Sequence, residues 1–212
     1  LINWQGGKPV RLETVDLSGY FNDKVKQIFK NKYLSPRPAV TTLQLPWQGI
    51  GDWPHPHENF EVNDSGFRKL AGDKNEILLP KGIRFSTPGE TNKNNILFTS
   101  QWDNYPQTAT IPLSGKASHA YFLMAGSTNT MQSQLTNGAV IVQYADGSAD
   151  SLVLRNPESW WPIDQDYFTD GFAFALQQPR PIRFHLKTGK IVSGEESKAK
   201  YNGKKIDGGA AT

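Results

Sequence analysis

The sequence contains no cysteine, so it can form neither disulfide bonds nor a metal site with thiolate ligands. No apolar run approaches the roughly 20 residues that a membrane-spanning helix requires. The first residues, LINWQGG, contain neither an initiator methionine nor the pattern of a signal peptide. We therefore expect a chain that does not insert into membranes and that is a mature product or a fragment of a larger protein.

A large excess of charge of one sign is also lacking. The chain has 23 Lys and Arg against 20 Asp and Glu, a formal net charge of +3. A nucleic-acid-binding surface would require a basic face with interleaved aromatic side chains, whereas the tryptophans here lie in segments of mixed charge. We therefore expect no nucleic-acid partner, and the lysine-rich stretch from Lys187 to Lys205 is interpreted as part of a solvated tail.

Turn residues, by contrast, are abundant. Nineteen glycines and 14 prolines recur along the whole chain, which is typical of short strands joined by turns. The strongest signal is Asp146-Gly147, because an Asp-Gly pair between two apolar runs favours a tight hairpin. The predicted strands are 40–45, 77–79, 83–85, 96–100, a consecutive series within 109–161 that includes this hairpin, 171–176, and 183–192 with a second hairpin turning at Thr188 and Gly189.

Only one helix is predicted, over residues 22–31, with Asn22 as its N-cap. Its apolar residues recur at intervals of three and four, which places them on one face: Phe21, Val25, Ile28 and Phe29. About ten short strands and one short helix predict an all-β fold, a jelly roll or related two-sheet sandwich. We expect a single domain over 1–212, with 1–76 as a loop-rich N-terminal part and 77–192 as the main strand block.

The tryptophans are the main candidates for contact with a ligand. A sugar ring stacks its C–H face on an aromatic plane, while amide and carboxylate groups beside that plane bind its hydroxyls. Two groups of residues offer this combination and are the predicted carbohydrate-binding residues: Trp102, Asp103, Asn104 and Tyr105, and Trp160, Trp161, Asp164 and Gln165. The alternative is that these rings fill the ends of the sandwich or an interface with another domain.

Catalysis by the chain itself has less support. Glycoside hydrolysis uses two carboxylates, and Asp164 and Asp166 would share one face of an extended strand. Asp52 and Glu58 flank a loop. Neither pair has an apolar setting that would clearly raise one pKa for acid catalysis, and the sequence lacks a G-x-S-x-G motif and a phosphate-binding glycine loop. No catalytic residue is predicted, and a glycoside hydrolase with a loop carboxylate pair is the alternative.

Neither a metal nor a cofactor is predicted. His55, His57 and Glu58 are of the ligand type, but without cysteine or a second histidine pair they are better explained as residues that line a turn. Calcium would find oxygen ligands at Asp146, at Asp150 or within 63–66, where the capping of turns is the simpler explanation.

Four segments carry a resemblance to a known group of proteins: in order, GIRF, NNILF, IPLSGKASHAYFLMAGSTN and GAVIVQYADGSADSLVLRNPESWWPIDQDY. They resemble the galactose-binding-like β-sandwich modules of large bacterial glycoside hydrolases, which are α-L-rhamnosidase-like or related uncharacterised polysaccharide-degrading proteins. The resemblance spans residues 80–167. It implies a jelly-roll accessory domain, secreted or periplasmic, that acts beside a catalytic domain which this chain lacks.

Together these observations predict a noncatalytic accessory module of a carbohydrate-active protein. Its partner would be a carbohydrate or the catalytic domain of a glycoside hydrolase. Besides the hydrolase named above, a structural interaction domain is a further alternative. Such a domain would bury its exposed aromatic residues against a partner and would self-associate when isolated.

Overall fold

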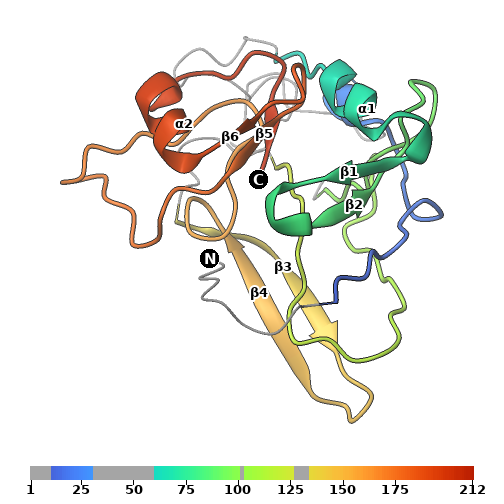
Figure 1. Ribbon diagram of the computed structural model, residues 1–212. Coiled ribbons are helices and arrows are strands. Elements are labelled where there is room, and N and C mark those ends of the chain that lie inside the picture. The colour runs from blue at the N-terminus through green and yellow to red at the C-terminus, as the bar shows by residue number, and fades with distance from the viewer. Residues whose placement is uncertain (1–10, 31–59, 101–102, 127–133) are drawn as a thin grey trace.

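The computed structural model describes residues 11–30, 60–100, 103–126 and 134–212. In this part of the chain the fold is β-rich, with short strands in small sheets and two short α-helices, α1 (Ser65–Ala71) and α2 (Gly194–Tyr201) (Figure 1). Three 3₁₀ turns accompany them: η1 (Val25–Gln27), η2 (Gly72–Lys74) and η3 (Pro80–Gly82). No helix among these residues has the length and apolar character needed to cross a membrane.

The strands form two hairpins and one three-stranded sheet. All pairings are antiparallel, between the strands β1 (Glu76–Leu78) and β2 (Arg84–Ser86), β3 (Thr136–Gln143) and β4 (Ala149–Arg155), and β5 (Arg183–His185) with both β6 (Ile191–Val192) and β7 (Ala210–Ala211). The strands predicted at 77–79 and 83–85 are therefore confirmed to within one residue.

The hairpin predicted at Asp146-Gly147 is confirmed as β3–β4. Gly147 has a φ of +86°, which explains why glycine occupies this position. The carboxylate of Asp146 accepts a hydrogen bond from the backbone N–H of Ser148 at 2.9 Å, so it holds the turn from inside. Figure 1 shows that this hairpin extends away from the rest of the fold.

The second predicted hairpin is also confirmed, with β5 and β6 joined by a turn in which Gly189 has a φ of +71°. The interpretation of the lysine-rich end as a solvated tail is wrong. Residues 194–201 form α2, which Ser193 caps by accepting a hydrogen bond from Glu196 N–H at 3.2 Å. Beyond it, Ile206 is buried and β7 completes the sheet. The lysines lie on the outer surface of these elements. Composition alone therefore could not distinguish this ordered segment from a solvated tail.

The helix predicted over 22–31 is shorter than expected. Only η1 forms within the described part of this segment, although Val25, Ile28 and Phe29 are buried together as their spacing predicted. Asn22 does not cap the turn. Its side-chain amide instead exchanges two hydrogen bonds of 2.8 Å with the backbone of Phe98, so it ties two distant segments together.

Three segments predicted as strands form none in the structure. Ile96 makes only a single bridge with Asp23, residues 109–125 contain no strand, and 171–176 forms a loop. An extended segment becomes a strand only when a second strand pairs with it. Within 109–125, Met124 pairs with Thr212 through two backbone hydrogen bonds of 2.7 and 2.8 Å, which is too short a pairing to form a strand. The strand predicted at 40–45 lies outside the described residues.

The hydrophobic core lies where α1, β1 and the sheet of β5 come together. Phe67 of α1 meets Phe184 of β5 edge to face, with ring centroids 5.2 Å apart. Beside them the backbone of Gly66 approaches the turn after β5 so closely that a Cβ atom would lie 2.3 Å from the nitrogen of Gly189. Helix α1 is therefore fixed against the C-terminal sheet by an approach that only glycine permits.

Candidate functional site

The paired tryptophans of the predicted carbohydrate site lie in the interior. Trp160 and Trp161 are 5% and 2% exposed. Trp160 packs directly on the backbone of Gly126, where a Cβ atom would come within 2.5 Å of its ring. Trp161 donates a hydrogen bond from Nε1 to the carbonyl oxygen of Pro157 at 2.9 Å. Neither ring offers an open face for a sugar, and their placement matches the alternative that they fill the interior.

A buried network of charges surrounds Trp161. The carboxylate of Asp166 lies 3.0 Å from Nη1 of Arg180 and 3.6 Å from Nε of Arg183, and it also accepts a hydrogen bond from the hydroxyl of Ser197. The guanidinium groups of the two arginines lie 5.0 and 5.7 Å from the centroid of the Trp161 ring, within the range of cation–π attraction.

The two arginines of this network bond to side chains, among them Thr169 and Thr212, and to backbone carbonyl groups. Burial lowers the pKa of Arg183 to about 10, which leaves it charged at neutral pH. It donates to the carbonyl oxygens of Pro162 and Ala210 at 2.6 and 3.4 Å. Arg180 donates to the carbonyl oxygen of Tyr167 at 2.7 Å. Together with the bond from Ser197 of α2 to Asp166, these bonds join α2, β7 and the segment after Trp161, so the network acts as a structural clamp of the C-terminal region.

The other predicted site residues separate into two places. Gln165 forms an isolated bridge with Lys205, and Asp164 is buried beside it. Tyr105 instead packs on Phe98, with centroids 4.8 Å apart, and its hydroxyl donates to Asp23. Of its neighbours, Asp103 is exposed and Asn104 half-buried, while Trp102 lies outside the described residues. Carbohydrate binding by these residues stays a prediction.

Asp164 and Asp166, the carboxylate pair of the hydrolase alternative, do not line an open cleft. The side chain of Asp166 is fully buried and paired with two arginines, and neither of the two hollows described below is lined by Asp164 or Asp166. The other pair, Asp52 and Glu58, lies outside the described residues.

The residues considered for calcium make turn contacts. Asp150 accepts a hydrogen bond from the hydroxyl of Tyr144 at 2.8 Å, and Asn63 accepts one from the backbone N–H of Ser65 at 3.0 Å. Among the residues that the structure describes, no group of three or more His, Asp or Glu side chains is arranged to hold a metal ion. His55 and His57 lie outside these residues.

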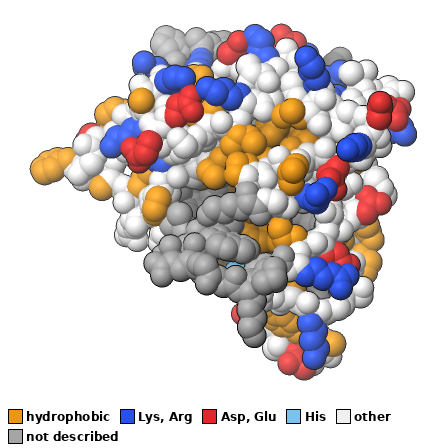
Figure 2. All heavy atoms as spheres, in the orientation of Figure 1, with side chains coloured by type: hydrophobic (Ala, Val, Ile, Leu, Met, Phe, Trp, Pro, Cys, Tyr) orange, Lys and Arg blue, Asp and Glu red, His pale blue; other side chains and the backbone are white. Residues whose placement is uncertain are grey.

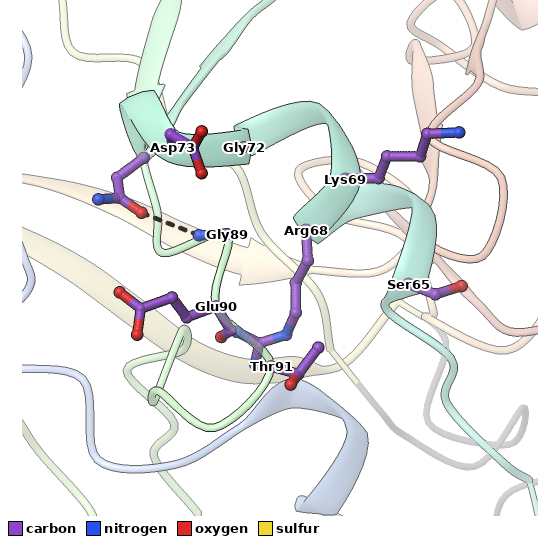
Figure 3. Close-up of a pocket in the computed structure, with 9 residues that line it drawn as sticks. Ser65, Arg68, Lys69, Gly72, Asp73, Gly89, Glu90 and Thr91 are labelled. Carbon is purple, nitrogen blue, oxygen red and sulfur yellow. Dashed lines mark hydrogen bonds between the residues drawn. The ribbon is translucent and has the colours of Figure 1, made fainter.

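A polar groove of about 490 Å³ lies between α1 with η2 on one side and the loop of residues 88–91 on the other (Figure 3). Its walls carry side chains of both charges together with hydroxyl and amide groups. The lining residues are Ser65, Arg68, Lys69, Gly72, Asp73, Asn75, Gly89, Glu90 and Thr91. None of them is aromatic, so the groove offers hydrogen-bonding groups without a stacking platform.

Arg68 holds the two walls of this groove together. Its side chain is buried and pairs through Nε with Asp64 at 2.8 Å. The rest of its guanidinium donates to three carbonyl oxygens of the opposite loop, those of Pro88, Glu90 and Lys93. Figure 3 shows Arg68 reaching from α1 towards Glu90 and Thr91. The buried Arg68 side chain therefore anchors the loop at Pro88, Glu90 and Lys93, and Asn75 holds it at Gly89 by accepting a hydrogen bond from the backbone N–H at 3.0 Å.

Apolar surface gathers on other parts of the molecule. A hollow of about 140 Å³ lies between the β1–β2 hairpin and β5, and its walls include Leu79, Ile83, Phe122 and Ile182. Figure 2 shows hydrophobic side chains gathered at the centre of this face. Apolar side chains make up most of the lining of the hollow, and Tyr121 and Thr212 add hydroxyl groups.

The β3–β4 hairpin exposes apolar side chains on both of its faces. In the observed register Ala139 lies opposite Val153, and Val140 lies opposite Leu152 on the other face. Ile141 is 60% exposed, and Val153 and Leu152 are exposed as well. A two-stranded hairpin is marginally stable in water unless another element covers it.

A second exposed apolar feature is the loop of residues 168–175. Phe172 is 91% exposed. Phe168 and Phe174 of the same loop contact each other, with their ring centroids 5.8 Å apart. Asp170 fixes this loop, because its carboxylate accepts hydrogen bonds from the backbone N–H groups of Phe172 and Phe174 at 2.7 and 2.9 Å. These bonds lower the pKa of Asp170. The exposed aromatic ring is thus presented on an ordered turn.

Comparison with known proteins gives no relative of this chain: no family model, no curated protein and no solved structure matches it. Its function must therefore be inferred from its own residues.

Sequence reasoning did not single out the groove or the aromatic loop. The groove residues come from 65–75 and 89–91, two segments whose polar composition is that of ordinary turns, and only the fold brings them together. A signal for the loop was present in DGFAFA, where an Asp precedes two phenylalanines, but the alternation of residues predicted a strand.

Proposed function

We propose that this chain is a noncatalytic accessory module of a carbohydrate-active protein, with a galactose-binding-like sandwich fold, and that it packs against the catalytic domain of a glycoside hydrolase. One observation carries the proposal: the β3–β4 hairpin leaves apolar side chains exposed on both faces. The remaining support is the sequence resemblance of residues 80–167 to such modules, which would act in the secreted or periplasmic compartment.

The pattern of the two strands favours a protein as the partner of this hairpin. Residues 140–142 are Val-Ile-Val and 152–154 are Leu-Val-Leu, and unbroken apolar runs are typical of strands covered on both sides. A sugar would need hydrogen-bonding groups beside an aromatic plane, whereas the large apolar groups exposed at the middle of this hairpin, Ile141, Leu152 and Val153, are aliphatic. Aliphatic surface on both faces fits burial between protein segments.

The buried position of Asp166 argues against the hydrolase alternative. A carboxylate paired with two arginines in the interior cannot reach a substrate unless the C-terminal region opens. The exposed apolar surface packs against a partner and takes no part in catalysis.

Hydrogen exchange tests this proposal directly. The purified chain is compared alone and mixed with the catalytic barrel of an α-L-rhamnosidase-like glycoside hydrolase, with exchange followed by mass spectrometry. We expect slower exchange in residues 136–155 on mixing. Ile141→Lys combined with Val153→Lys, which places two charges on one face of the hairpin, should abolish this protection.

Ser118→Lys, a charge introduced at an exposed site outside the hairpin, is the matched control and should leave the protection unchanged. Exchange that is unchanged by the barrel would overturn the proposed partner. If the chain instead self-associates through the same residues, as shown by sedimentation velocity, a structural interaction domain becomes the better explanation. Turnover of aryl glycosides by the isolated chain would contradict the noncatalytic assignment.

A further inference from the structure

We propose that β3 accepts a β-strand from the catalytic domain along its outer edge, so that the β3–β4 hairpin becomes part of a larger sheet. Strand addition rests on the packing proposed above and specifies how the partner engages the hairpin, through backbone hydrogen bonds at one edge as well as through side chains on the faces. Three observations carry it: the direction of the backbone groups in β3, the lack of charge along this strand, and the closure of the opposite edge by Ser159.

The register of the hairpin fixes which backbone groups of β3 point outward. Beside the turn, the N–H of Tyr144 donates to the carbonyl oxygen of Ser148 at 2.9 Å. Pairs with and without hydrogen bonds alternate along an antiparallel ladder, so the next bonded pair is formed by the residues two positions further along each strand. Ala139, Ile141 and Gln143 therefore belong to the pairs without hydrogen bonds, and their N–H and C=O groups point away from β4.

These outward groups have no partner in the part of the chain that the structure describes. There β3 and β4 form a sheet of two strands, so no further strand bonds to β3. Among the described residues, no hydrogen bond outside the sheet involves the backbone of Ala139, Ile141 or Gln143. All three side chains are exposed. Each residue offers one donor and one acceptor, and a row of such groups at a sheet edge readily pairs with an added strand.

The sequence of β3 lacks the usual protection of an edge against added strands. Natural edge strands carry charged side chains, proline or bulges, yet no Asp, Glu, Lys, Arg or Pro occurs from Ala117 to Ala145. The register shift of the hairpin lies between Thr136 and Gly138, at the start of β3, and leaves residues 138–143 in regular pairing. A strand added along this regular part meets neither like charge nor an irregular backbone.

The edge of β4 is protected in both ways. Ser159 folds back on it, because its hydroxyl donates to the carbonyl oxygen of Val153 at 2.8 Å and accepts from the backbone N–H of Arg155 at 2.8 Å. This strand also carries two charged side chains, Asp150 and Arg155. The two edges of the hairpin are therefore unequal, and β3 is the edge that is open to a partner.

The side chains along this edge determine which segment fits it. An added strand would lie beside Val140 and Val142 on one face of the sheet and beside Ile141 on the other, because successive residues of a strand point to opposite faces. A charged group brought beside these aliphatic side chains would lose hydration without gaining a partner. The partner segment is therefore an extended, uncharged strand, rich in the β-branched residues that favour this conformation.

Amide exchange resolved to single residues tests the pairing. The isotopically labelled chain is exchanged alone and in complex with the catalytic barrel of an α-L-rhamnosidase-like glycoside hydrolase, then quenched and measured by NMR. In the complex the amides of Ala139, Ile141 and Gln143 should exchange at least about tenfold more slowly, because each gains an acceptor. The amide of Ser151, which lies directly opposite Ile141 and points away from β3, is the internal control and should be unchanged.

A pair of proline variants separates the two edges. Ile141→Pro removes the outward N–H at the middle of β3 and leaves the ladder intact, because that N–H does not bond to β4. This variant should lose the protection that the barrel confers on the β3 edge. The matched control is Ser151→Pro, which removes the outward N–H at the opposite position in β4 and should keep the protection. Ile141→Ala retains the N–H and should keep it as well, at reduced affinity.

The possible outcomes distinguish strand addition from the packing on which it rests. If exchange slows across the hairpin but the amides of Ile141 and Ser151 respond alike, strand addition is overturned and the packing stands. If the barrel changes no amide of the hairpin, both are overturned. Protected β3 amides in the chain alone, with dimers in sedimentation velocity, would make a second copy the occupant and overturn the catalytic domain as the source of the strand. The exchange of the parent chain decides between these outcomes even if a proline variant fails to fold.

Discussion

Asp166 and Arg180 form a buried ion pair, with 3.0 Å between Oδ2 and Nη1 and both side chains almost inaccessible to water. The pair joins the segment after the tryptophans to the loop before β5. The same carboxylate also faces Arg183 and accepts a hydrogen bond from the hydroxyl of Ser197 in α2. Asp166 therefore lies against two buried cations at the point where the C-terminal elements meet.

Asp166→Asn is expected to destabilise the fold strongly. Loss of one member of a buried charge group leaves the others uncompensated in the interior, and such changes cost about 3–5 kcal/mol. Urea unfolding followed by tryptophan fluorescence measures the change. As a control, Asp207→Asn disrupts an ion pair with Lys187 at the surface, where the Asp207 side chain is 81% exposed, and should cost below about 1 kcal/mol. Equal effects of the two variants would refute the clamp.

Stability should decrease on acidification through the titration of His185. Burial, and then the charge of Arg183, hold the pKa of His185 below its ordinary value of 6.5. The unfolded chain therefore binds the proton more readily, so the free energy of unfolding increases with pH in this range. The contribution of neutral His185 is fully present above pH 6.5 and is lost as the pH decreases through the lower pKa of the folded state.

Thermal unfolding between about pH 5.5 and pH 7.5, about one unit either side of the ordinary histidine pKa, measures this dependence. His185→Gln should flatten it, whereas His119→Gln at an exposed position should not. Glu196 titrates in a separate range, because hydrogen bonds from Lys190 and Lys200 lower its pKa to about 2. An unchanged pH dependence in His185→Gln would contradict the prediction.

Gly66→Ala should separate α1 from the C-terminal sheet. The added methyl group would lie 2.3 Å from the backbone nitrogen of Gly189, and backbone atoms cannot rotate away as a side chain can. Overpacking of this kind costs about 1–3 kcal/mol. Gly19→Ala introduces the same group where nothing lies within 4 Å. Denaturant titration should therefore show a large difference between the two variants, and equal midpoints would disprove the close approach.

Phe172→Ser should leave stability nearly unchanged, within about 0.5 kcal/mol, because the ring is 91% exposed. It should nevertheless reduce the binding of a hydrophobic dye and any self-association of the chain, since a large apolar group leaves the surface. Phe184→Ala provides the contrast, because truncation of a buried phenylalanine costs about 3–5 kcal/mol. A loss of stability in Phe172→Ser comparable to that of Phe184→Ala would show that the ring is not a surface feature.

The local features of this fold were accessible from the sequence. Asp146-Gly147 and Thr188-Gly189 each specify a hairpin, because the turn conformation depends on a few neighbouring residues and on glycine at positive φ. The burial of Val25, Ile28 and Phe29 also followed from their spacing, which any helical turn converts into one face. These predictions needed no knowledge of distant contacts.

The candidate sites, in contrast, depend on segments far apart in the chain. Residues 65–75 and 89–91 form one groove because Arg68 donates to the carbonyl oxygen of Glu90 and Asn75 accepts from the backbone N–H of Gly89. Trp161 is enclosed by Arg180 and Arg183, whose proximity no local pattern predicts. Its sequence neighbours are polar, which suggested an exposed ring, but burial is decided by what the rest of the chain places over a residue.

The sequence alone was enough to predict the β-rich class, the two hairpin turns and the apolar face of the first helical turn, because each follows from short-range geometry. Only the tertiary structure decided which extended segments became strands, which charges were paired in the interior and which apolar groups stayed outside. The physical reason is that strand pairing and burial each require a partner from elsewhere in the chain, and the free energy of that contact does not depend on neighbours in sequence.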